Sequence, residues 1–388
     1  MKKLADLADV TVGFVGTMTP HYRDSGVPFL RSQNVTPHAV DLTDLKFIDP
    51  DFDQSIRKSA LSPGDVVIVR TGKPGTAAVI PDSIEHANCA DLVVVRPGPE
   101  LNSRWFSYFM NSAARHAVSA NTVGAVHQHF NVGAAKALKL PDVSLSEQQR
   151  VAEVLGALDD KIAANRAAIS TGQNLIQAQW EQQSSGANEI RNLDEVVDLN
   201  PRTQLPAEGS HPFLDMKDLP QNGLLVDRWS ERESRSGSKF RNGDTLLARI
   251  TPCFENGKIG LVDFLPPDVT GLGSTEYIVL RPKDGVPQAV PYCIAASDPF
   301  RAHAARGMTG TSGRQRVQAM NIGDYPVGWP GKDALDRFGG FTDALIRRLS
   351  ASRNENALLA RTRDELLPLL MNGRITVKDA ECAAEDVL

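Results

Sequence analysis

The segment SLSEQQRVAEVLGALDDKIAANRAAISTGQNLI (144–176) decides the architecture expected of this chain. Ser144, with Glu147 three residues later, is a capping-box pattern that marks the N-terminus of a helix. From Val151 onward, apolar residues recur at alternating steps of four and three, with Asn165 as a polar member of the series. This a/d repeat is typical of a helix that packs against another helix in a coiled coil.

A second segment, from Phe341 to Leu370, follows the same alternation less purely, and Gly373 stands behind it as a predicted C-cap. A single heptad run would fit an amphipathic helix on its own domain equally well. Two matched runs, each after a strand-rich region, favour an antiparallel coiled coil between the two helices. The predicted seam consists of Leu155, Leu158, Ile162, Asn165, Ile169, Leu345, Leu349, Asn356, Leu359 and Leu366.

The two strand-rich regions repeat each other. SPGDVVIVRTG (62–72) corresponds to RNGDTLLARIT (241–251), and DLVVVRPG (91–98) corresponds to EYIVLRPK (276–283). Five such pairs occur in one order, shifted by roughly 180 to 190 residues, which indicates a duplicated domain and not a solenoid of short repeats. The short apolar stretches between Gly and Pro predict strands.

We therefore predict an α+β protein. Two pseudo-symmetric, strand-rich domains of mixed α/β structure are separated by two long helices that form an antiparallel coiled coil. The expected segments are a first domain over 1–145, a first helix over 146–186, a second domain over 187–332, a second helix over 333–375, and an acidic tail over 376–388 that we expect to fray.

Composition excludes several classes of protein. The chain has 388 residues, 41% apolar and 23% charged, as expected for a globular protein of two or three domains. Its net charge of −5 argues against a protein that coats nucleic acid non-specifically, although a local basic groove remains open. The four cysteines form no CxxC pair, so we expect reduced thiols and a cytoplasmic protein. No apolar run approaches the length of a membrane span.

Motifs of catalysis are missing. The sequence contains no P-loop, no GxSxG elbow and no HExxH pair, and His127 with His129 is a weak signal for a metal. We predict no metal site and no catalytic residue. Two equivalent domains without such motifs favour binding over catalysis.

The distribution of charge is more informative than its sum. No acidic residue stands between Glu100 and Asp142, or between Asp298 and Asp324, and each window contains a polar, Gly-rich loop. Such loops suit contacts with phosphates and base edges, while a plain surface loop is the alternative. From these and neighbouring loops we predict DNA contacts at Arg31, Gln33, Asn34, Arg70, Thr71, Lys73, His127, Gln128, His129, Lys217, Arg249, Thr251, Lys258, Thr311, Ser312, Arg314, Gln315 and Arg316.

The segment LPDVSLSEQQRVAEVLGALDDKIAANRAAI (140–169) resembles the first conserved region of the specificity subunits of type I restriction–modification systems. The family's pattern is matched at Pro141, Glu147, Gln148, Val151, Leu158, Asp159, Lys161, Ile162 and Asn165. The duplicated layout extends the resemblance over nearly the whole chain. The second helix departs from the pattern, because GKDALDRFGGFTDAL (331–345) lacks the Glu-Gln start.

The resemblance implies a non-catalytic, DNA-binding subunit of an enzyme complex. Each target recognition domain would recognise one half of a bipartite, asymmetric sequence in double-stranded DNA. The helices would set the spacer and recruit two methyltransferase subunits, which use S-adenosylmethionine to methylate adenine at N6. A translocating endonuclease subunit that requires ATP and Mg would complete a restriction complex. The chain itself would bind no cofactor and no membrane.

One alternative belongs to a different class. Two similar domains joined by helices also fit a two-headed scaffold that binds proteins and recognises no DNA. A free-standing nuclease is the least favoured possibility.

Overall fold

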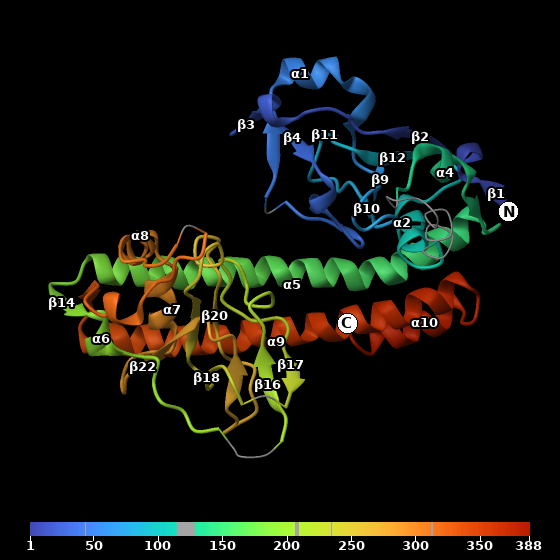
Figure 1. The fold of residues 1–388 in the computed structure, drawn as a ribbon. Coiled ribbons are helices and arrows are strands. Elements are labelled where there is room, and N and C mark those ends of the chain that lie inside the picture. Colours follow the sequence, from blue (N-terminus) through green and yellow to red (C-terminus); the bar gives the residue numbers. More distant parts are fainter. Residues whose placement is uncertain (43, 115–128, 206–208, 234, 312) are drawn as a thin grey trace. The chain divides into compact units, whose positions relative to one another are not determined.

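The computed structural model describes residues 1–42, 44–114, 129–205, 209–233, 235–311 and 313–388 (Figure 1). The chain divides into two compact units. Unit 1 contains Met1–Ile162 and Ala357–Leu388, and unit 2 contains Ala163–Asn356. No helix among the described residues is long and apolar enough to cross a membrane.

Unit 1 is built on two sheets. Its antiparallel four-stranded sheet has the order β10 (Ala77–Val79), β9 (Val66–Val69), β12 (Leu92–Pro97) and β2 (Ala8–Val12). Its five-stranded sheet has the order β3 (Tyr22–Arg23), β7 (Lys46–Ile48), β4 (Val27–Leu30), β11 (Ala87–Cys89) and β8 (Ala60–Leu61), with only β4 and β11 parallel. Two short ribbons pair β1 (Lys2–Lys3) with β13 (Lys139–Leu140) and β5 (Val35–Thr36) with β6 (Ala39–Val40). The short helices are α1 (Pro50–Ser55), α2 (Ser103–Asn111) and α4 (Val132–Ala137).

Unit 2 repeats this plan. Its antiparallel sheet has the order β15 (Val197–Leu199), β22 (Tyr277–Pro282), β19 (Thr245–Ala248) and β20 (Ile259–Leu261). Its second sheet has the order β17 (Ser230–Arg232), β16 (His211–Leu214), β21 (Gly271–Gly273) and β18 (Ser238–Phe240), and again only one pair, β16 and β21, is parallel. The ribbon of β14 (Glu189–Asn192) and β23 (Pro326–Trp329) corresponds to that of β1 and β13. Three short helices complete the unit: α6 (Leu193–Val196), α7 (Ala289–Ala296) and α8 (Asp298–Arg306).

Two long helices, α5 (Leu145–Ser185) and α9 (Lys332–Met371), run antiparallel within each unit. In unit 1, Arg363 of α9 forms an ion pair with Asp159 of α5. In unit 2, Asn165 Nδ2 donates a hydrogen bond to Asn356 Oδ1 at 3.0 Å. Residue numbers fall along α9 as they rise along α5, so the predicted antiparallel pairing and the α+β class are confirmed.

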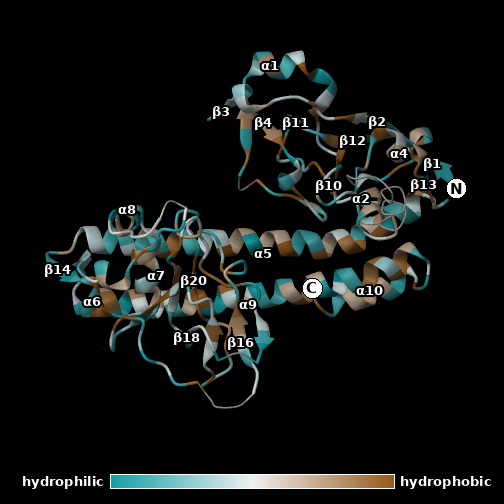
Figure 2. Ribbon diagram, in the orientation of Figure 1, coloured by the Kyte–Doolittle hydropathy of each residue, from teal (hydrophilic) through white to brown (hydrophobic). Residues whose placement is uncertain are grey.

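The predicted seam residues lie on the inner sides of these helices. In unit 1 they are buried in one core with residues of α2. In unit 2 they are buried or partly buried beside α7. The unit 1 members are Leu155, Leu158, Ile162, Leu359 and Leu366, and the unit 2 members are Asn165, Ile169, Leu345, Leu349 and Asn356. Figure 2 shows the corresponding alternation of hydrophobic and hydrophilic residues along α5 and α9.

The C-terminal segment does not fray, so that prediction is wrong. Residues Val377–Glu385 form helix α10, which begins with a reciprocal capping box between Thr376 and Asp379. Ala380 and Ala384 are buried in the core of unit 1. The acidic composition of the tail hid this small apolar face.

Candidate nucleic-acid interface

In unit 1, a polar cluster forms where strand β9 ends. Arg70 donates hydrogen bonds to the carboxylate of Asp91 and to Nε2 of His129. Since arginine only donates, Nε2 of His129 must accept, and the hydrogen on Nδ1 then points to the Thr71 hydroxyl at 2.8 Å. The Phe130 amide donates to the Arg70 carbonyl at 3.0 Å, which holds residues 129–130 against the strand end. We call these residues, and the corresponding residues 313–317 of unit 2, the returning loop. The Arg70 side chain is only 13% exposed, so its main role is to hold the other residues of the cluster in place.

Unit 2 has a cluster at the equivalent position, where β19 ends. Arg316 donates through Nε and Nη2 to the carboxylate of Glu276, at 2.7 to 3.0 Å. Arg249 Nη2 donates to Gln318 at 3.2 Å, and its Nε lies 3.9 Å from Glu276 Oε2. The hydrogen bonds from Arg316 hold the pKa of Glu276 below its ordinary value, so this carboxylate stays charged. The Val317 amide donates to the Arg249 carbonyl at 2.8 Å.

The two clusters match position by position. Arg70 and Arg249 each follow the same strand of the sheet, and Asp91 and Glu276 each stand at the start of the strand beside it. His129 and Arg316 occupy the same place in the returning loop, because the next residue of each donates its amide to the arginine carbonyl. Each unit therefore brings its strand-end arginine beside a residue of its acid-free window, His129 in unit 1 and Arg316 in unit 2.

Several predicted contact residues hold their own loops. Asn34 is 2% exposed, accepts from the Arg31 amide at 3.0 Å and donates to the Asp41 carbonyl at 3.0 Å. Thr251 is buried, and its hydroxyl accepts from the Gln315 amide at 3.0 Å. Lys258 donates to the carbonyls of Lys217 and Leu219, at 3.1 and 2.8 Å. The side chains of Arg31 and Gln33 both bind Asp44.

Other predicted residues are open to solvent. Lys73, Lys217, Thr311 and Arg314 are exposed, and their side chains have no hydrogen bond or ion pair to any residue that the structure describes. Lysine and arginine in this state can approach phosphates without breaking an internal contact. His127, Gln128 and Ser312 lie outside the described residues.

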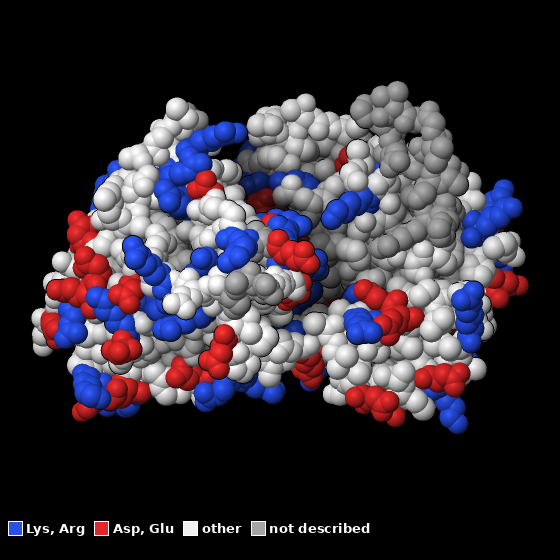
Figure 3. Space-filling model, turned by 60° about the horizontal axis from the view of Figure 1, so that its bottom comes forward, with Lys and Arg blue, Asp and Glu red and all other residues white. Residues whose placement is uncertain are grey.

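Sequence reasoning missed one aromatic surface in unit 2. The Trp229 ring, 39% exposed, stacks on Phe264 with centroids 4.4 Å apart, and the Arg232 guanidinium lies 4.2 Å from the centre of the Phe213 ring. The available signal was Trp229 beside Arg228, with Arg232 three residues after the tryptophan. On the face shown in Figure 3, Lys and Arg side chains are mixed with Asp and Glu side chains. In the described ranges, no group of His, Cys, Asp and Glu is arranged to hold a metal ion.

Comparison with known proteins shows which proteins the chain resembles. No protein-family profile matches the chain. The specificity subunit of the Escherichia coli type I restriction enzyme EcoEI is 24% identical over 201 residues, and that of EcoAI is 26% identical over 145 residues. The crystal structure of the S subunit of a type I restriction–modification system from M. genitalium superposes with a TM-score of 0.56 over 95% of both chains, at 14% identity. The chain resembles type I specificity subunits. The matches cover 50% and 36% of this chain but only 34% and 24% of the two curated relatives, so the chain spans about a third of their length or less.

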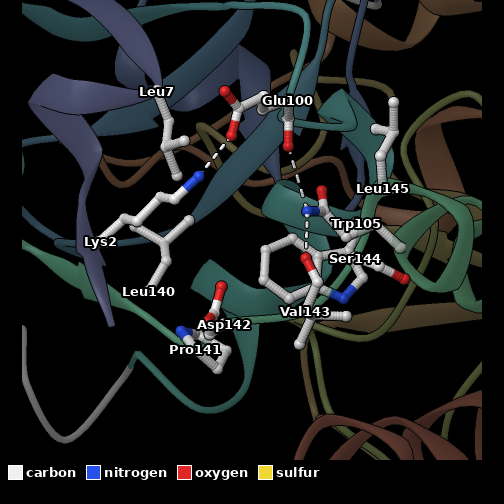
Figure 4. A pocket seen from close by; sticks show the side chains of 11 residues that line it. Lys2, Leu7, Glu100, Trp105, Leu140, Pro141, Asp142, Val143, Ser144 and Leu145 are labelled. Atoms are coloured by element: carbon white, nitrogen blue, oxygen red, sulfur yellow. Dashed lines mark hydrogen bonds and ion pairs between the residues drawn. The ribbon is translucent and has the colours of Figure 1, made fainter.

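The specificity-subunit motif at the start of α5 has a structural explanation. Gln148 is 4% exposed and makes three hydrogen bonds. Its Nε2 donates to the carbonyls of Glu100 and Val143 at 3.2 and 3.0 Å, and its Oε1 accepts from the Asn102 amide at 2.9 Å. Figure 4 shows Glu100 and Val143 at the small cavity beside this contact, which has a volume of about 150 Å³. The motif glutamine thus joins the long helix to the loop before α2.

Proposed function

We propose that this chain is a non-catalytic, sequence-specific DNA-binding subunit of a type I restriction–modification complex. The observation that carries the proposal is the matched cluster in the two units. Both units have one scaffold and one placement of arginine and carboxylate, but the returning loop presents His129 in one and Arg316 in the other. Two similar surfaces with different side chains suit a target with two different halves.

The two units together have residues for two kinds of contact. Exposed cations can neutralise phosphates and set the register on the duplex, and Lys73, Lys217 and Arg314 are suited to this role. Base edges require donors and acceptors in a fixed geometry, and Arg316 is held in such a geometry by Glu276.

In unit 1 both ring nitrogens of His129 are bound within the cluster, to Arg70 and to Thr71, so this histidine holds the loop in place beside the strand end. Most of the remaining described residues from the predicted set support the loops, whereas the Thr311 side chain is exposed and has no such contact in the part of the chain that the structure describes.

The paired helices supply the rest of the proposed function. Helices α5 and α9 would set the number of base pairs between the two half-targets and recruit two methyltransferase subunits. These subunits would carry S-adenosylmethionine and methylate adenine at N6. An endonuclease subunit with ATP and Mg would add cleavage. The chain would act in the cytoplasm and would itself hold no cofactor.

The test is a single-molecule methylome. Cells that carry this gene together with the gene of the proposed methyltransferase partner are compared with cells that lack only this gene. A split N6-methyladenine motif that depends on the gene is the expected result. Gene-independent methylation, or none, would favour the two-headed protein-binding scaffold.

A variant assigns the recognition surface. Arg314→Ala should lower methylation by weakening the contact of one half-target, while the other half stays as strictly required as before. The matched control is Arg202→Ala, which removes the same charge from an exposed position of unit 2 outside the long helices and should leave the recognition of both halves unchanged. Equal behaviour of the two variants would count against the loop as the contact surface.

A further inference from the structure

A carboxylate stands at the centre of each proposed contact surface. Asp91 and Glu276 directly precede the central strands β12 and β22 of their units. Both side chains are partly exposed, at 41% and 25%. Negative charge repels the phosphates of DNA, so a carboxylate placed here needs another role.

The hydrogen bonds show what these carboxylates hold. In unit 2, Glu276 binds Nε and Nη2 of Arg316 in the two-pronged arrangement that fixes the plane of a guanidinium. Nη1 of Arg316 donates to the Arg314 carbonyl at 3.3 Å, and the backbones of Thr309 and Arg316 exchange hydrogen bonds of 3.0 and 2.8 Å. The Arg316 side chain nevertheless stays 37% exposed. A guanidinium held along one edge presents its remaining donors in a fixed direction.

In unit 1 the carboxylate reaches the returning loop through an arginine that is not part of that loop. Asp91 binds Nη1 of Arg70, and Nη2 of Arg70 donates to His129. This orients the imidazole ring and fixes which of its nitrogens accepts. The carboxylate therefore helps to fix the position of His129 and of the residues beside it in unit 1.

We propose that Asp91 and Glu276 are positioning residues for sequence recognition, each ordering the returning loop of its own unit through an arginine. The inference rests on the proposed function, because it assumes that the loops contact DNA. The carboxylates themselves touch no base. Their removal should therefore change the selectivity for one half-target and leave the overall attraction to DNA intact or stronger.

Glu276→Gln separates positioning from simple electrostatics. The substitution keeps the size of the side chain and removes a negative charge, so electrostatics alone predicts tighter binding to every duplex. Positioning predicts that sites with one changed base pair in one half become methylated, with preference for the correct base falling about tenfold. Glu276→Asp, which keeps the charge, should restore part of the selectivity. Glu255→Gln is the matched control, since Glu255 is exposed and has no side-chain partner among the described residues.

Asp91→Asn should have the same effect on the other half of the target. Its matched control is Asp82→Asn, at an exposed position of unit 1 whose side chain has no partner in the described part of the chain. The readout is the single-molecule methylome of cells carrying the full chain and the gene of the proposed methyltransferase partner. It is scored separately for base changes in each half.

A second measurement does not depend on DNA. Hydrogen exchange of the purified full chain should show that Glu276→Gln lowers the protection of the Thr309 and Arg316 amides, while the amides of β22 stay protected. The inference is rejected if Glu276→Gln behaves like its control Glu255→Gln in both measurements. It is also rejected if Glu276→Gln and Asp91→Asn reduce the selectivity for the same half of the target. In either case the proposed function stands. If wild-type cells show no gene-dependent methylation, the proposed function and this inference fail together.

Discussion

Gln148 illustrates how one buried polar residue can join two elements. Its side chain satisfies one carbonyl and one amide in the loop before α2, at Glu100 and Asn102, and the Val143 carbonyl in the segment before α5. Gln148→Leu keeps a similar volume but leaves these buried groups without partners, so we expect the free energy of unfolding to fall by about 2 kcal/mol. Gln149→Leu, at the exposed neighbouring position, should change it little. Urea unfolding of the two variants checks the prediction, and equal losses would contradict it.

The equivalent aspartates of the two units differ in a measurable way. Asp244 accepts two hydrogen bonds of 2.7 Å from the buried Arg281, whereas Asp65 lies 3.9 Å from Arg96. Burial outweighs the favourable contacts of Asp65 and raises its pKa, so its charge contributes little to stability.

Asp244→Asn should therefore cost about 3 kcal/mol, because it leaves the buried guanidinium of Arg281 without a counter-charge. Asp65→Asn should cost about 1 kcal/mol or less. Urea unfolding of both variants gives the comparison within one molecule. If Asp65→Asn lowered the free energy of unfolding more than Asp244→Asn, the geometry of the two ion pairs would not explain their contributions to stability.

At the scale of residues, the sequence shows which side chains have the chemistry for DNA contacts but not which groups these side chains bind. Asn34 and Lys258 have the chemistry of DNA contacts, but both bind backbone carbonyls of their own units. Asp91 and Glu276 were missed because an acidic residue counts against a DNA contact when charge alone is considered. Glu276 lies 40 residues from Arg316 in the chain, and nothing in the local sequence links them.

At the scale of elements, sequence predicted the long helices well and the last helix badly. The heptad pattern of α5 is visible in the sequence because each seam position packs against the same neighbouring helix. Each of these positions therefore favours an apolar residue. The polar seam position Asn165 meets Asn356, the polar seam position of the other helix, although no register for the pair was predicted from the sequence. Helix α10 is short, and its two buried alanines make too small an apolar face to stand out.

Helices α2, α5 and α9 meet in unit 1 at Asp159. Its carboxylate accepts from the Tyr108 hydroxyl at 2.5 Å and from Arg363 at 2.5 Å, and its side chain is largely buried. The neighbouring Asp160 pairs with Arg104, but both partners are mostly exposed. Asp160 is therefore a solvated surface carboxylate, whereas Asp159 is not.

Asp159→Asn should lower the free energy of unfolding by about 3 kcal/mol, because Arg363 loses its buried counter-charge. Asp160→Asn is the matched control and should cost less than about 1 kcal/mol, since exposed ion pairs contribute little. Denaturant titration followed by circular dichroism measures both. A substantial loss for Asp160→Asn would mean that the exposed pair is also needed at this junction.

At the scale of the whole molecule, the two units share their scaffold and differ in their loops. Both use an aspartate after a glycine, at Asp65 and Asp244, to start the strand that leads to the cluster. Both place a Pro-marked ribbon before a long helix, β13 before α5 and β23 before α9. These shared features indicate that residues 1–145 and 187–332 can replace each other without changing the segments that connect them to α5 and α9.

Such an exchange tests directly whether each of the two segments recognises one half of the target. A chain in which 187–332 is replaced by a second copy of 1–145 should carry the Arg70–Asp91–His129 cluster twice. If each unit recognises one half of the target, the asymmetric methylation motif should be replaced by one built from two copies of a single half-sequence. The reciprocal chain, with 187–332 in place of 1–145, is the matched control and should yield two copies of the other half. The methylome of cells with each chain and the gene of the proposed methyltransferase partner is the measurement. Retention of the original asymmetric motif in either chain would show that recognition does not lie in the exchanged units, because no other part of the chain changes.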